Sequence, residues 1–138
     1  MARIDATEIL QQSLDGLSMR QRTTANNIAN VDTPGYKATQ VSFENQLAQA
    51  VDAELSRRSG IQLAATDPAH LSAGPRGLGQ VEPVVSRLDE MSYRNDENSV
   101  DIEREMALLA ETQLRYSTLS SLVSRRLAIE RNIVRGGN

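Results

Sequence analysis

The sequence predicts a mainly α-helical protein, in which long N- and C-terminal helices pair as a coiled-coil-like hairpin. Apolar residues recur with heptad spacing near the start of the chain and again over its last third. Between residues 38 and 98 this periodicity is lost, and we expect an irregular segment with a short helix and short strands. The chain therefore divides into residues 1–37, 38–98 and 99–138.

The first predicted helix covers residues 5–30. Its apolar stripe advances in alternating steps of four and three, which places the whole stripe on one face of a helix. Gly16 lies inside this helix and weakens it by about 1 kcal/mol relative to alanine. We expect four members of the stripe to form a packing seam, namely Leu10, Leu14, Leu17 and Ile28. The remaining members are Gln21, Thr24 and Val31.

Residues 25–37, Ala-Asn-Asn-Ile-Ala-Asn-Val-Asp-Thr-Pro-Gly-Tyr-Lys, end this helix. Three asparagines crowd its last turns, although asparagine is unfavourable inside a helix. Pro34 and Gly35 suit the two central positions of a type II turn and would set the direction of the exiting chain. We expect Tyr36 to anchor the turn. The three asparagines should hydrogen-bond to backbone at the helix end or to a neighbouring molecule, and they are Asn26, Asn27 and Asn30.

The middle segment contains weaker signals. Residues 41–56 suggest a helix with apolar residues every fourth position, and the short apolar runs at 61–65 and 81–85 suggest strands. The stretch between these runs is rich in glycine and proline and should form a loop. It holds the only histidine, His70, which no candidate ligands accompany, so we interpret it as a solvent-exposed loop residue.

The last predicted helix covers residues 99–135, with Ser99 as its N-cap and Gly136-Gly137 closing it. It carries two heptad-like stripes, so its apolar face is too wide for one partner helix. The first stripe should supply the seam that faces the N-terminal helix, through Met106, Leu109, Tyr116, Val123 and Leu127. The second contains Leu108, Thr112, Leu119, Leu122, Ile129 and Ile133, interrupted by Arg115 and Arg126. A simple hairpin within one chain and packing between chains both explain the stripes, and their width favours packing between chains.

Charge and composition narrow the range of functions. Acidic residues outnumber basic ones eight to two over residues 89–111, and basic residues outnumber acidic ones five to one over 115–138. Such a polarised helix could pair head-to-tail with its copy. The net charge of -3 disfavours nucleic-acid binding, and the absence of cysteine excludes thiolate metal sites and disulfides. The N-terminus has no apolar core of a signal peptide, so we expect any export to proceed without one.

No constellation for catalysis is visible. The segment Gly74–Gly79 lacks the lysine and hydroxyl residue that end a phosphate-binding loop, and no nucleophile with a base can be sketched. We interpret the carboxylates at 101, 103 and 105 as a solvated helix start. The sequence therefore predicts no enzyme activity, cofactor, metal or small-molecule substrate.

Residues 25–37 resemble the N-terminal signature of the flagellar basal-body rod proteins, most closely in their proximal rod members. Residues 98–116 resemble the C-terminal helix of the same family, and residues 62–71 resemble one of its middle segments. The resemblance implies a structural subunit that leaves through the flagellar type III export apparatus. It would assemble with itself, with other rod proteins and with basal-body ring or export-gate adaptor proteins, into the periplasm-spanning shaft that transmits torque.

Three other interpretations remain open at this point. The chain could be a neighbouring axial subunit of the same family, since one sequence does not separate them. It could be a helical adaptor or scaffold that binds partner helices in the cytoplasm. It could also be a cell-wall hydrolase acting near the rod, although it lacks a convincing acid and base pair.

Overall fold

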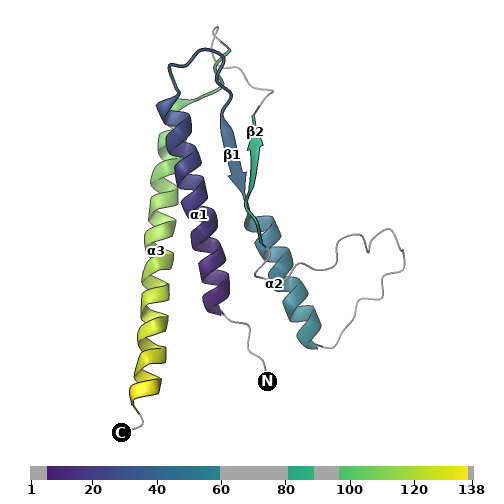
Figure 1. Cartoon of the computed structure of the whole chain (residues 1–138), viewed down its shortest axis with the longest axis vertical. Helices are drawn as coiled ribbons and strands as arrows, with labels where there is room; N and C mark the ends of the chain where they lie inside the picture. The colour runs from purple at the N-terminus through teal and green to yellow at the C-terminus, as the bar shows by residue number, and fades with distance from the viewer. Residues whose placement is uncertain (1–5, 60–80, 89–96, 137–138) are drawn as a thin grey trace, which may run out of the picture.

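The computed structural model describes residues 6–59, 81–88 and 97–136, and these residues are mainly helical (Figure 1). Two long helices lie side by side and antiparallel, with a shorter helix and a two-stranded sheet beside them. This arrangement confirms the predicted fold class. The elements in chain order are α1 (Ala6–Ala29), β1 (Thr39–Ser42), α2 (Glu44–Ser59), β2 (Val84–Arg87) and α3 (Ile102–Arg135).

The ends of α3 differ from the prediction in detail. Asp101 is the N-cap, since its Oδ1 accepts hydrogen bonds from the backbone N–H of Glu103 at 3.1 Å and of Arg104 at 3.2 Å. Ser99 is therefore not the cap, and its Oγ accepts a hydrogen bond from Ala38 N instead. Gly136 ends the helix, with its N–H directed to Asn132 O. Of the predicted pair of closing glycines, Gly137 lies outside the described residues.

The predicted helix at 41–56 begins later, at Glu44, because the residues before it form a strand. β1 pairs with β2 in antiparallel register, with Val41 opposite Val85. A β-branched residue suits this half-covered sheet, and Val41 is almost fully buried. The second predicted strand shifts from 81–85 to 84–87, just after Pro83, which has no N–H to donate to a ladder. The strand predicted at 61–65 and His70 lie outside the described residues.

The hydrophobic core is small and lies between α1, β1 and α2. One cluster contains Leu17, Val41 and Phe43, with Leu47 and Leu119 against it. A second cluster joins Ala50 to Val81. The scarcity of aromatic residues limits how much apolar area such a core can enclose. Most of α3 consequently lies at the surface. Within the described part of the chain, no helix is both long and apolar enough to cross a membrane.

Gly16 is the point of closest approach between α1 and the start of α2. A Cβ at this position would lie 2.6 Å from ring atoms of Phe43, so only glycine leaves room for the ring. The Arg20 guanidinium lies 5.0 Å from the centre of the same ring. It also donates to Val41 O at 3.1 Å and pairs with the Glu44 carboxylate at 2.6 Å. The sequence reveals the helix-weakening effect of Gly16 but not this packing role.

The pKa of the Glu44 carboxyl reflects its contacts with Arg20 and with backbone N–H groups. Partial burial would raise its pKa, but hydrogen bonds from Arg20 and from backbone N–H groups outweigh that effect. The pKa of Glu44 is therefore lowered, and the carboxylate stays charged at neutral pH. The pair is partly exposed to solvent, so we regard it as fixing the position of α2 more than adding stability.

We predict that Gly16→Ala lowers the free energy of unfolding by about 1–2 kcal/mol, because the Phe43 ring must move and overpacking outweighs the gain in helix propensity. In a Phe43→Leu background the ring is absent, and the same substitution should raise stability by up to about 1 kcal/mol. Urea unfolding followed by circular dichroism measures both. An increase in both backgrounds would show that the ring does not rest on Gly16.

Candidate functional site

The chain leaves α1 through a tight turn over residues 33–36. Tyr36 N–H donates to Thr33 O at 3.2 Å, which closes the turn. Gly35, its third residue, has φ +70°, the left-handed value that a type II turn requires there. Pro34 and Gly35 are exposed, so their part in the turn is conformational and not a contact.

The Asn27 side chain joins three separate segments at the end of α1. Its amide accepts a hydrogen bond from Thr39 N at 3.0 Å and donates to Thr39 O at 2.8 Å, as a neighbouring strand would. The same amide accepts from Tyr36 Oη at 3.1 Å and donates to Glu105 Oε2 at 3.1 Å. Asn27 is 1 % exposed. We call Asn27, Tyr36, Thr39 and Glu105 the Asn27 junction.

The other two asparagines of the motif bond close to the helix end. Asn30 Nδ2 donates to Asn26 O at 2.9 Å and to Asn26 Oδ1 at 2.8 Å. Tyr36 Oη also lies 3.3 Å from Asn26 Oδ1. These bonds lie at the surface, unlike those of Asn27, so the three asparagines contribute unequally. The Tyr36 hydroxyl thus bonds to two residues of α1, and its expected role in anchoring the turn stays a prediction.

Asn98, which the sequence interpretation missed, holds the turn from the opposite side. It is fully buried, and its Nδ2 lies 2.8–3.0 Å from the carbonyl oxygens of Asn30, Val31 and Thr33. The next residue, Ser99, donates its N–H to Tyr36 O at 3.1 Å. Residues 97–100 therefore pin the turn to the start of α3. In the sequence, Asn98 and Ser99 are visible only as two polar residues before the apolar Val100. This pattern does not predict which groups they bond to.

Glu105 contradicts the expected solvated cluster of carboxylates. Glu103 is exposed and Asp101 is half-buried, but Glu105 is only 7 % exposed and faces Asn27. Burial raises the pKa of the Glu105 carboxyl above its ordinary value, while the hydrogen bond from Asn27 and the charge of Arg104 act in the opposite direction. The carboxyl is therefore a buried element of the helix pair.

The face of α3 that meets α1 is set by a seven-residue repeat. Glu105 bonds to Asn27, Leu119 packs on the Leu17 cluster, and Arg126 Nε donates to Thr7 Oγ1 at 3.0 Å. Thr112 shares this spacing and is 1 % exposed. Both hydrogen-bonded contacts fit one antiparallel register, and the face corresponds to the second predicted stripe more than to the first.

The predicted packing residues fall into three groups by exposure. On α1, Leu17 is buried and the other three are half-buried. On α3, two are half-buried and three are exposed, so the exposed ones do not form a seam within the chain. Their role in packing between molecules remains a prediction. The half-buried residues are Leu10, Leu14, Ile28, Leu109 and Val123, and the exposed ones are Met106 (59 %), Tyr116 (39 %) and Leu127 (43 %).

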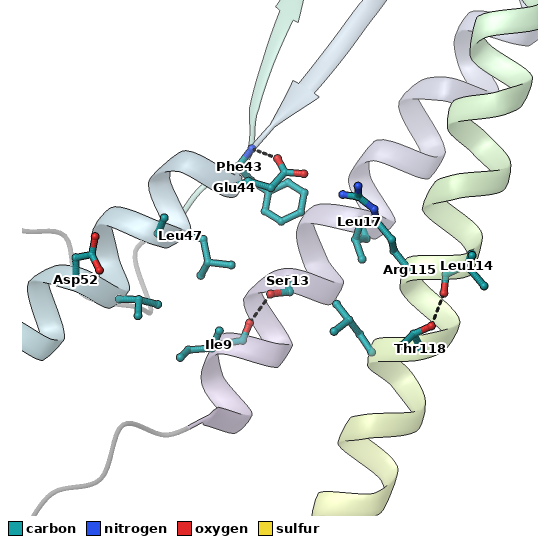
Figure 2. Close-up of a pocket in the computed structure, with 13 residues that line it drawn as sticks. Ile9, Ser13, Leu17, Phe43, Glu44, Leu47, Asp52, Leu114, Arg115 and Thr118 are labelled. Carbon is teal, nitrogen blue, oxygen red and sulfur yellow. Dashed lines mark hydrogen bonds between the residues drawn. The ribbon is translucent and has the colours of Figure 1, made fainter.

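An open cleft of about 720 Å³ separates α2 from α1 and α3 (Figure 2). Its walls are mostly apolar, with Ile9 and Leu17 from α1, Leu47 and Val51 from α2, and Leu114 from α3. Leu114 is 69 % exposed although it borders the cleft. Polar groups lie at the margins, among them Glu44, Asp52 and Arg115. Such a surface suits an apolar partner and offers no convergent polar groups for chemistry.

Among residues 6–59, 81–88 and 97–136, no cluster of three or more histidine, cysteine or acidic side chains could hold a metal ion. The titratable groups with shifted pKa values, Glu44 and Glu105, each bond to another part of the fold. Both are explained by structure, so neither is a candidate acid or base.

Comparison with known proteins identifies close relatives. Residues 14–37 match the family model described as flagella basal body rod protein. The flagellar basal body rod protein FlgB of Borrelia hermsii is 39 % identical over 119 residues, which cover 85 % of this chain and 86 % of the relative. FlgB of Bacillus subtilis (strain 168) is 34 % identical over 93 % of this chain and 92 % of its own. FlgB of Salmonella typhimurium is 31 % identical over 99 % and 98 %.

We predict that Asn27→Ala lowers the free energy of unfolding by about 2–4 kcal/mol, because it leaves the Glu105 carboxyl and the Thr39 backbone without their partner. Asn26→Ala is the matched control at the adjacent exposed position and should cost about 1 kcal/mol or less. Thermal and urea unfolding measure both. Equal losses in the two variants would contradict the junction.

The raised pKa of Glu105 predicts a specific pH dependence. Folding binds the Glu105 proton more tightly, so ionisation of this group destabilises the folded state above its raised pKa. Glu105→Gln keeps the acceptor for Asn27 and removes the charge, so the variant should be more stable than the parent at pH 7. This advantage should shrink as the pH falls through the raised pKa towards 4.5, the ordinary value. Urea unfolding at several pH values tests it, and an advantage that grows on acidification would refute it.

Proposed function

The chain belongs to the FlgB family of flagellar basal body rod proteins, and from this premise we propose that it is the subunit of the proximal rod. It is a structural component of the basal body and not an enzyme. The proposal adds that it polymerises with itself and with other axial proteins into a shaft that crosses the periplasm and transmits torque. Its further partners would be basal-body ring or export-gate adaptor proteins, and it would leave the cytoplasm through the flagellar type III apparatus without a cleaved signal peptide.

The observation that carries the assembly proposal is the outward apolar surface of α3. Met106, Tyr116 and Leu127 share one side of the helix and are exposed, although each is large and apolar or aromatic. A single exposed apolar residue needs no explanation, but a row along a 34-residue helix does. Burial of this row against other subunits would supply contacts along the whole shaft, as torque transmission requires.

The division of the chain follows the same proposal. Residues 1–37 and 99–138 would build the helical wall of the shaft, and residues 38–98 would form the part between the two helices. The Asn27 junction supports this division, because it ties the end of the first part to the start of the last one.

The experiment is complementation of a strain that lacks the gene, combined with immunogold labelling of its isolated basal bodies. The wild-type gene should restore swimming, and the label should lie on the rod. Absence of the protein from basal bodies, together with normal swimming of the deletion strain, would refute the proposal and favour a cytoplasmic helical adaptor.

We predict that Met106→Asp and Tyr116→Asp each reduce swimming to the level of the deletion strain while the purified subunit keeps its wild-type melting temperature. Both side chains are already exposed in the single chain, so the charge is costly only where another subunit would bury it. Ser121→Asp is the matched control on a polar, exposed part of α3 and should swim normally. Wild-type swimming by both Met106→Asp and Tyr116→Asp would contradict packing through this row.

A further inference from the structure

The last turns of α3 extend past the start of α1 (Figure 1). Arg126 bonds to Thr7 near the first described residue of α1, so α3 has no α1 residue beside it beyond this point in the described chain. Every residue from Leu127 to Gly136 is exposed, and no other described helical stretch of this length is. We call Leu127–Arg135 the α3 overhang. It carries three strongly exposed apolar residues, Ile129 (60 %), Ile133 (74 %) and Val134 (85 %).

The cleft between α2 and the α1–α3 pair is the second open apolar surface. The cleft has walls on more than one side. A helix that fills it must therefore have exposed apolar residues on more than one of its faces. The α3 overhang meets this condition, since Ile129 and Ile133 lie on one side of it and Leu127 and Val134 on another. Elsewhere, α1 and α3 bury a face against each other.

The overhang cannot reach the cleft of its own chain. α3 is one continuous helix of 34 residues, and its end points away from the cleft, whose α3 wall is formed by Leu114, Arg115, Thr118 and Leu119. To fold back, the helix would have to break and lose backbone hydrogen bonds. The two surfaces can therefore meet only between two molecules.

We propose that the α3 overhang of one subunit packs into the cleft of a second copy of the same chain. This inference rests on the proposed rod function and names one of its contacts. The contact joins different surfaces of the two copies, so it leaves one free overhang and one free cleft at the ends and can propagate into an open helical polymer.

Size and charge support this pairing. The overhang and the α1 wall of the cleft from Ile9 to Leu17 have the same number of residues, and each is about 12 Å long at 1.5 Å per residue. Arg131 and Arg135 follow each other by one turn on the flank of the overhang. Among the side chains that the structure describes, the α2 side of the cleft offers Glu44 and Asp52 and no basic residue. Glu44 already pairs with Arg20, so Asp52 is the acceptor that an incoming arginine would meet.

The test uses thiol crosslinking, which the absence of cysteine in the parent chain makes unambiguous. Ala48→Cys places a thiol on the α2 wall and Ile133→Cys places one on the overhang. Cells that express both single variants, one of them epitope-tagged, are treated with a short bis-maleimide before basal bodies are isolated. We expect a tagged–untagged dimer, and a ladder of higher oligomers when both cysteines are in one chain.

The matched control replaces Ala48→Cys with Ala110→Cys, an exposed position on α3 that does not line the cleft. The cleft pair should give about tenfold more product than the control pair, since docking holds the two thiols at a high effective concentration. Equal yields from the two pairs would overturn the proposal. A product that joins Ile133→Cys to a different rod protein would also overturn it, because the occupant would not be a second copy.

Swimming and recovery of the cysteine variants in basal bodies separate this inference from the function it rests on. Full recovery without the specific crosslink refutes the docking and leaves the rod function intact. Failure to recover the wild-type chain in basal bodies refutes both.

Discussion

The fold depends on the hydrogen bonds of one buried amide, that of Asn27. Through it the end of α1 is joined to the backbone of β1, to Tyr36 in the turn, and to Glu105 on α3. Apolar contacts alone would allow two helices with heptad stripes to slide by a turn at modest cost. A buried carboxyl with a single side-chain donor does not permit that, since a shift would leave both groups unpaired. The junction therefore fixes the register of the helix pair and the point at which the chain enters the sheet.

The register of the helix pair also determines which residues of α3 stay exposed to solvent. Four residues of α3 are turned towards α1, and three of the four are polar or charged: Glu105, Thr112 and Arg126, with Leu119 the apolar one. Many of the large apolar residues of α3 therefore lie at the surface and not against α1. The single chain therefore retains exposed apolar area on α3 that other molecules can bury. In the proposed rod, burial of this area by other subunits would add hydrophobic stabilisation, so the stability of the subunit and its polymerisation would be coupled by mass action.

Heptad spacing was enough to predict the two long helices, and the Pro34–Gly35 pair was enough to predict the turn, because both signals are local. The choice between the two stripes of α3 was not predictable in this way. Both stripes have the same period. The hydrogen bond between Asn27 and Glu105, which lie 78 residues apart, determines which of the two faces α1. Asn98 was missed for the same reason, since its three acceptors lie in a turn more than 60 residues away. A periodic pattern shows that a face exists, but it does not show what covers that face.

The cleft stays open because α2 is attached at two points, and this affects how much free energy a partner would lose on binding there. The start of α2 is fixed to α1 by the Phe43 ring on Gly16 and by the contacts of Arg20 with Glu44 and Val41 O. Further along α2, Ala50 packs against Val81, with Ile9, Leu47 and Val51 around them. These two attachments hold α2 at a distance from α3 without closing the space between them. A surface held open in this way loses little conformational freedom when a partner enters, so more of the contact energy is retained as binding. Gly16 is unfavourable for helix α1 alone, but it admits the Phe43 ring that fixes the start of α2. It thereby helps to keep the cleft open.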